Sequence, residues 1–140
     1  QPLNNREGPD SFNILPALTD SPEKQIRDHL ILSPHKKTNL TIRKDKWVYI
    51  DAQGSGGFRG KLETDYERGG PGALLLTQHT NSDIQDGKLK SNAPPAQLYD
   101  LEADLTQTQN LYHQHPEIAR KMKALLERYK KAPRTAPERN

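Results

Sequence analysis

Residues 40–50, LTIRKDKWVYI, decide the fold. Polar and apolar residues alternate from Asn39 to Arg43, which is typical of a strand with one buried face. Residues 46–51 are rich in β-branched and aromatic side chains, and a tight turn at Lys44–Asp45 would join the two runs. We therefore predict a β-hairpin. Its inward side chains would be Leu40 and Ile42 on the first strand, with either Trp47 and Tyr49 or Val48 and Ile50 on the second.

Flanking segments predict the rest of the architecture. Short apolar runs at 29–33 and 97–101 read as further strands, and Pro116 suits the first position of a helix that runs to Lys131. The helix carries apolar residues at helical spacing. These are Ile118, Met122, Leu125, Leu126 and Tyr129. The predicted fold class is α+β, a small antiparallel sheet of three to four strands packed by one long C-terminal amphipathic helix, with a long irregular loop insertion.

The boundaries of the predicted units follow composition. Residues 1–28 are expected to be a linker with a short helix that starts at Phe12 and is capped by Asp10 or Ser11. Residues 29–131 would form the α+β unit, with the glycine-rich insertion at 52–95, and residues 132–140 a disordered tail. An insertion of this length in a compact domain is either functional or covers something.

Composition limits the possible functions. The chain has 140 residues, 31% of them hydrophobic, and a net charge of +3. It contains no cysteine, which excludes disulfides, thiolate zinc sites and cysteine nucleophiles. No apolar run approaches the length of a membrane span, and aromatic residues make up only 6%, too few for a nucleic-acid stacking surface. We expect neither a membrane nor a nucleic acid as partner.

Residues 53–61, QGSGGFRGK, form the most conspicuous loop. A phosphate-binding loop is excluded because Ser55 stands where that motif needs glycine and Leu62 where it needs Ser or Thr. The stretch is then either a flexible loop after a strand or a place where the backbone approaches a ligand closely. On the second interpretation the candidate substrate-binding residues are His35, Gly54, Ser55, Gly56, Gly57 and Phe58.

Other motifs for metal binding or catalysis are incomplete or absent in the sequence. Asp100, Glu102 and Asp104 begin like a calcium loop, but Leu105 and Leu111 occupy the positions that need Gly and Glu. There is no HExxH motif and no serine in a GxSxG elbow. We expect no catalytic residue, no metal site and no cofactor in this chain.

Four segments together resemble the C-terminal part of arylsulfatases. Residues 40–50 resemble the A-I-R-x-G-x-W-K-L-I hairpin of that family. Residues 98–104, followed by Asn110–Leu111, resemble its L-Y-D-L-x-x-D-P-x-E-x-x-N-L motif, and residues 115–118 open a helix like the one that ends those enzymes. Residues 10–18 and 27–30 look like the stretch that joins the catalytic domain to this subdomain. The likeness covers most of residues 9–131.

The resemblance implies a role in a larger parent. The parent would be an exported (periplasmic or extracellular) sulfuric ester hydrolase that uses calcium and a formylglycine residue, and this chain would be an excised fragment that is inactive alone. Its partners would be the catalytic domain of the same parent chain and a sulfated substrate, either a sulfated carbohydrate or an aryl sulfate. The fragment would complete the fold and rim the substrate pocket. The alternative is a free-standing carbohydrate- or protein-binding module.

Overall fold

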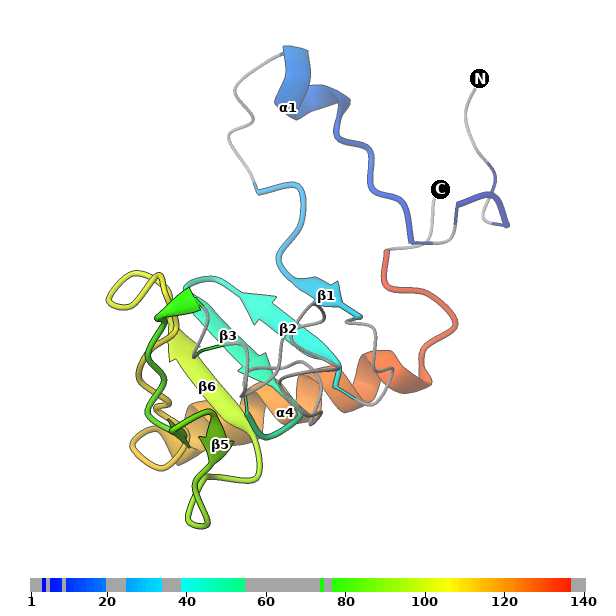
Figure 1. Cartoon of the computed structure of the whole chain (residues 1–140). Coiled ribbons are helices and arrows are strands. Elements are labelled where there is room, and N and C mark those ends of the chain that lie inside the picture. The colour runs from blue at the N-terminus through cyan, green and yellow to red at the C-terminus, as the bar shows by residue number, and fades with distance from the viewer. Residues whose placement is uncertain are drawn as a thin grey trace.

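The computed structural model describes residues 4, 6–8, 10–19, 25–33, 39–54, 74 and 77–136. Four strands form an antiparallel sheet in the order β1-β2-β3-β6. Their bounds are Leu30–Leu32 (β1), Thr41–Lys44 (β2), Trp47–Ile50 (β3) and Gln97–Asp100 (β6). The long helix α4, Pro116–Lys131, crosses one face of this sheet (Figure 1). The predicted α+β fold class is confirmed.

The β2–β3 hairpin forms as predicted, but its turn lies one residue further along the chain. Lys44 is still paired, opposite Trp47, so the turn residues are Asp45 and Lys46 rather than Lys44 and Asp45. Asp45 adopts a left-handed backbone with φ of 52°. Aspartate tolerates this conformation better than most residues because its short polar side chain can hydrogen-bond locally.

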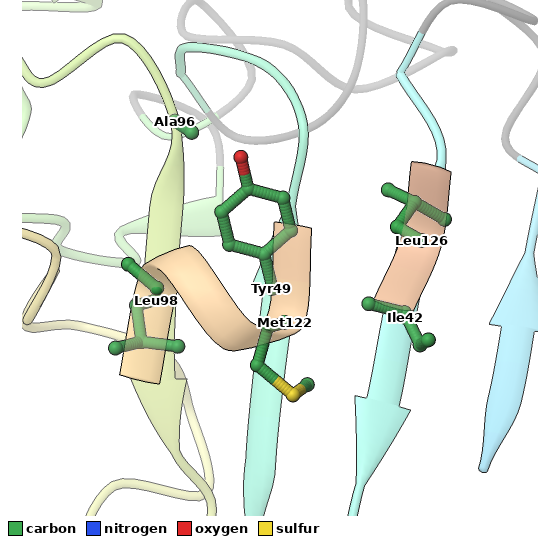
Figure 2. Packing of buried hydrophobic residues seen from close by; sticks show 7 residues of the cluster. Ile42, Tyr49, Ala96, Leu98, Met122 and Leu126 are labelled. Carbon is green, nitrogen blue, oxygen red and sulfur yellow. The ribbon is translucent and has the colours of Figure 1, made fainter. Parts of the chain in front are cut away.

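The core between sheet and helix is built from alternate strand residues. Ile42, Tyr49 and Leu98 point toward α4 and pack against Met122 and Leu126 (Figure 2). Tyr49 and Leu126 are both 0% exposed. Together these side chains make the main apolar contact that holds the helix on the sheet.

Both predicted alternatives for the second strand are buried. Tyr49 lies on the α4 side, with Trp47 half-buried beside it, whereas Val48 and Ile50 belong to a second cluster with Tyr99. Helix α4 covers one face of β3, and other segments cover the second face, among them the one that carries Asn81, which donates to the Tyr99 hydroxyl. The second cluster lies on the sheet face opposite α4 because its residues alternate with those that face the helix.

Helix α4 has the predicted bounds. His115 precedes it as the cap residue and Pro116 opens it, where a missing N–H costs nothing. Lys130 in its last turn forms an ion pair of 2.6 Å with Asp51, just after β3. Helix and sheet are therefore joined by charge as well as by the apolar contact. None of the helices in the described part of the chain has both the length and the apolar character needed to cross a membrane.

The N-terminal helix α1, Leu15–Thr19, is shorter than predicted. The prediction that it starts at Phe12 is wrong, because a proline ring at position 16 clashes with a helical carbonyl four residues earlier. The side chain of Asn13, rather than Asp10 or Ser11, accepts a hydrogen bond from the Leu15 N–H at 3.0 Å. The helix stands apart from the sheet and none of its residues is buried (Figure 1).

The insertion is not irregular throughout. Its second half contains a small hairpin of β4, Ile84–Gln85, and β5, Lys88–Leu89. Asp86 and Gly87 form its turn with φ of 50° and 68°, the left-handed pair that a type I′ turn requires. A backbone hydrogen bond of 2.7 Å from Ser82 to Thr108 ties this region to the segment after β6.

Candidate functional site

Of the predicted substrate-binding residues, only Gly54 is described. His35, Ser55, Gly56, Gly57 and Phe58 lie outside the described residues. Gly54 is buried and has φ of 76°, a left-handed conformation that glycine alone adopts without strain. The glycine at this position therefore has a structural reason, which is to redirect the chain four residues after β3.

Hydrogen bonds fix the start of this loop on the sheet. The Gln53 side chain donates to the Ala93 carbonyl at 3.1 Å, and the Gln97 side chain donates to the Ala52 carbonyl at 2.9 Å. Gln97 lies on β6, opposite Ile50 at the end of β3. These contacts hold Ala52 and Gln53, the two residues before Gly54, against β6 and the segment before it.

A cavity of about 200 Å³ lies beside this point. Three of its lining residues, Ile50, Gln97 and Tyr99, come from the sheet face opposite α4, and the others from the segments before β4 and after β6. The described lining consists of Ile50, Leu74, His79, Asn81, Gln97, Tyr99, Thr106 and Gln107. Gln97 thus lines the cavity and also binds the Ala52 carbonyl, two residues before Gly54.

A hydrogen-bond network forms the floor of the cavity. The Tyr99 hydroxyl donates to Gln97 Oε1 at 2.6 Å and accepts from Asn81 Nδ2 at 2.8 Å. Asn81 also donates to the Gln107 carbonyl and accepts from the Asp83 N–H, both at 3.0 Å. Burial raises the pKa of Tyr99, which keeps its hydroxyl protonated as a donor. The floor is therefore made of uncharged groups that hydrogen-bond to one another and to the backbone.

A second polar cluster joins β1 to α4. His29 is buried and its ring stacks on Tyr129 with centroids 4.1 Å apart. Its Nδ1 lies 2.6 Å from the Asp28 carboxylate, which also accepts a hydrogen bond of 3.0 Å from Lys44. The hydrogen bonds from His29 and Lys44 lower the pKa of Asp28. No local sequence pattern predicts this cluster, because Tyr129 is 100 residues from His29.

The acidic side chains at the end of β6 and just after it bind backbone N–H groups and a lysine within the chain. Asp100 pairs with Lys46 at 2.7 Å and accepts the Glu102 N–H at 3.0 Å, while Asp104 accepts the Gln109 N–H at 2.8 Å. Among the described residues no group of three His, Cys, Asp or Glu side chains could hold a metal ion. The part of the chain that the structure describes therefore does not fit a calcium site, and a sequence without cysteine does not fit a formylglycine made from one.

Comparison with known proteins finds similarity among solved structures. No protein-family model matches the chain, and no curated protein does. A solved structure, the Bacteroides thetaiotaomicron sulfatase BT33336S-sulf, matches with a TM-score of 0.60 and 25% sequence identity over 94% of this chain. The fold is sulfatase-related. The chain spans 22% of the length of that sulfatase, which is described with a genetic locus for the metabolism of multiple glycosaminoglycans.

Proposed function

We propose that this chain is the C-terminal subdomain of a sulfuric ester hydrolase, where it completes the fold and rims the substrate pocket without catalytic residues of its own. The observation that carries the proposal is the match to one sulfatase over 94% of this chain but only 22% of that enzyme. A unit of that relative size needs the rest of the enzyme for its chemistry. The partner is then the catalytic domain of the same parent chain.

The chemistry of the chain supports this division. A formylglycine is made from Cys or Ser in a C/S-x-P-x-R motif in the family that the chain resembles. The chain has no cysteine, and its only x-x-P-x-R spacing begins at Thr135, whose hydroxyl donates to Asp10 at 2.9 Å. Calcium and formylglycine thus belong to the parent, which we expect to be exported, and residues 29–131 are the unit that docks on it.

The glycine-rich loop is the part proposed to reach the substrate. Its start is fixed by Gln53 and Gln97, and Gly54 turns it away from β3. On this proposal His35 and residues 55–58 line the pocket edge against a sulfated carbohydrate or an aryl sulfate. The glycosaminoglycan context of the similar sulfatase favours the carbohydrate.

A second candidate function is a free-standing carbohydrate-binding module. The cavity floored by Asn81, Gln97 and Tyr99 favours it, because the His79 and Gln107 side chains that also line it can bind sugar hydroxyls without any enzyme. The sulfatase function requires a catalytic domain upstream of the chain, whereas a free-standing module does not.

Reconstitution tests the proposal. We expect the in-frame sequence upstream to encode a C/S-x-P-x-R motif. The assay measures turnover of a chromogenic aryl sulfate in the presence of calcium. It compares three samples, which are the upstream part alone, this chain alone and the two together. We expect no turnover by the chain alone and restored turnover by the mixture. Turnover by the repurified chain alone, or an unrelated upstream domain, contradicts the proposal.

A further inference from the structure

We infer that the cavity floored by Tyr99 and Gln97 is a subsite for an uncharged sugar ring. This inference rests on the proposed function, because the sugar ring would be part of the substrate of the proposed sulfatase. The cavity lies next to the start of the glycine-rich loop, since Gln97 lines the cavity and also holds the Ala52 carbonyl.

The first argument is that the floor is already built. Asn81, Gln97 and Tyr99 are linked to one another by hydrogen bonds of 2.6 to 2.8 Å. Tyr99 and Gln97 are each 1% exposed, so their positions are set by packing. A cavity whose floor needs no rearrangement loses little entropy when a ligand binds.

The second argument is the hydrogen-bonding capacity that remains. In the described part of the chain the side chains of His79 and Gln107 have no hydrogen-bond partner, and both line the cavity. A carboxamide offers both a donor and an acceptor, and an imidazole carries two ring nitrogens that take part in hydrogen bonds. A sugar hydroxyl also donates and accepts, so neighbouring ring hydroxyls match these two groups.

The third argument is charge. No lysine or arginine is among the described lining residues, although sulfate and carboxylate groups are usually bound by these cations. Two carboxylates, Asp83 and Asp104, lie near enough to Tyr99 to raise the pKa of its hydroxyl in addition to the larger effect of burial. The oxygens of both aspartates already accept hydrogen bonds within the chain. The site therefore disfavours an anionic ring and has no free carboxylate for a cationic one.

The backbone supplies a matched pair of variants. Gln107 and Gln78 have nearly the same left-handed conformation, with φ of 58° and 56°. Only Gln107 lines the cavity, and Gln78 is exposed. Gln107→Gly thus removes the amide while it keeps the carbonyl that Asn81 binds, and glycine suits this φ. Gln78→Gly makes the same change outside the cavity.

The experiment is a titration of the ¹⁵N-labelled 140-residue chain, followed by backbone amide shifts. The probes are methyl glucoside and methyl galactoside as neutral rings, methyl glucuronide as the anionic ring and glucosamine as the cationic ring. We expect saturable shifts at residues 79–81, 97–99 and 107 with a neutral probe. Gln107→Gly should weaken that binding about fivefold and Gln78→Gly should leave it unchanged.

Several outcomes overturn the inference. These are no saturable shift at those residues in a chain with a dispersed spectrum, tighter binding of the glucuronide or of glucosamine, and an equal loss in both glycine variants. Binding of a neutral sugar without reconstitution of sulfatase activity would leave the inference standing while the proposed function fails. The two tests therefore fail separately.

Discussion

Asn110 connects the segments around the end of the sheet through a single side chain. Its Oδ1 accepts the N–H groups of Leu98 and Tyr112 at 3.0 Å. Its Nδ2 donates to Asp83 at 2.6 Å and to the Ala96 carbonyl at 3.1 Å. The amide has two donors and two acceptor lone pairs, so all of its capacity is used.

Asn110→Asp should therefore be strongly destabilising. The new carboxylate would face the buried Asp83 across a distance that is 2.6 Å in the native chain, and both N–H donors, to Asp83 and to the Ala96 carbonyl, would be lost. We expect a loss of about 3 kcal/mol in the free energy of unfolding at neutral pH. Part of it should return as the pH is lowered, because one of two adjacent carboxyls takes up a proton more readily than a lone carboxyl does. Urea unfolding at neutral and at acidic pH measures this.

Asn92→Asp is the control for that variant, since Asn92 is exposed. It should change the free energy of unfolding by less than about 0.5 kcal/mol. Equal losses in the two variants would show that Asn110 is not the connecting residue described above.

Gly54→Ala tests whether the turn after β3 needs glycine. The methyl group would be forced into a buried position at φ of 76°, with an expected loss of about 2 kcal/mol in stability. Gly87 in the β4–β5 turn has φ of 68° and is only half-buried. Gly87→Ala therefore has a similar backbone strain with less crowding, and should lose about 1 kcal/mol in stability. Thermal unfolding of both variants is the measurement, and a smaller loss for Gly54→Ala would refute the crowding.

At the scale of elements, α4 depends on how deeply each apolar residue reaches the sheet. Leu126 is 0% exposed and Leu125 is half-buried, although both lie on the apolar stripe. Leu126→Ala should lower the free energy of unfolding by about 3 kcal/mol, Leu125→Ala by less, and the exposed Lys123→Ala by almost nothing. Chemical denaturation gives the order, and equal values for Leu125 and Leu126 would contradict the packing shown in Figure 2.

Elements with a strong local period could be predicted from the sequence. The strands of the main hairpin and α4 are of this kind, because alternation and helical spacing are written in neighbouring residues. The β4–β5 hairpin was missed although Asp86–Gly87 is a strong turn signal. Its strands have two residues each, too few to show a period.

The candidate site was only partly predictable for the same reason. Glycines at 54, 56 and 57 mark a loop in the sequence, and φ of 76° at Gly54 explains one of them. The floor of the cavity joins Asn81 to Tyr99 across 18 residues, and the second cluster joins His29 to Tyr129 across 100. Such pairs depend on the tertiary fold, so no sequence spacing indicates them.

At the scale of the whole molecule, carboxylates connect distant segments. The Thr135 N–H and hydroxyl lower the pKa of Asp10, hydrogen bonds from His29 and Lys44 lower that of Asp28, and Lys46 lowers that of Asp100. An acid whose pKa is lower in the folded state stabilises that state above its ordinary pKa, here 3.8. This contribution is lost as the pH falls through the lowered values.

We therefore expect the melting temperature to hold down to the ordinary aspartate pKa of 3.8 and to fall below it. Asp100→Asn should make this acid-induced fall smaller, because one of the linked carboxylates no longer titrates. Calorimetry of both proteins across the acid range is the test. An equally steep fall in the variant would show that Asp100 does not contribute.

The hydrogen bond of 2.6 Å from the Thr135 N–H to Asp10 has a consequence for engineering. Two points that are 125 residues apart in sequence lie side by side, so the chain between them leaves and returns at one place. Such a unit can be inserted into a loop of another protein, because its two ends are adjacent and the two ends of the recipient loop can stay close together. On the proposed function, grafting residues 10–135 between sulfatases would transfer the whole unit, the proposed sugar subsite included, through two adjacent junctions.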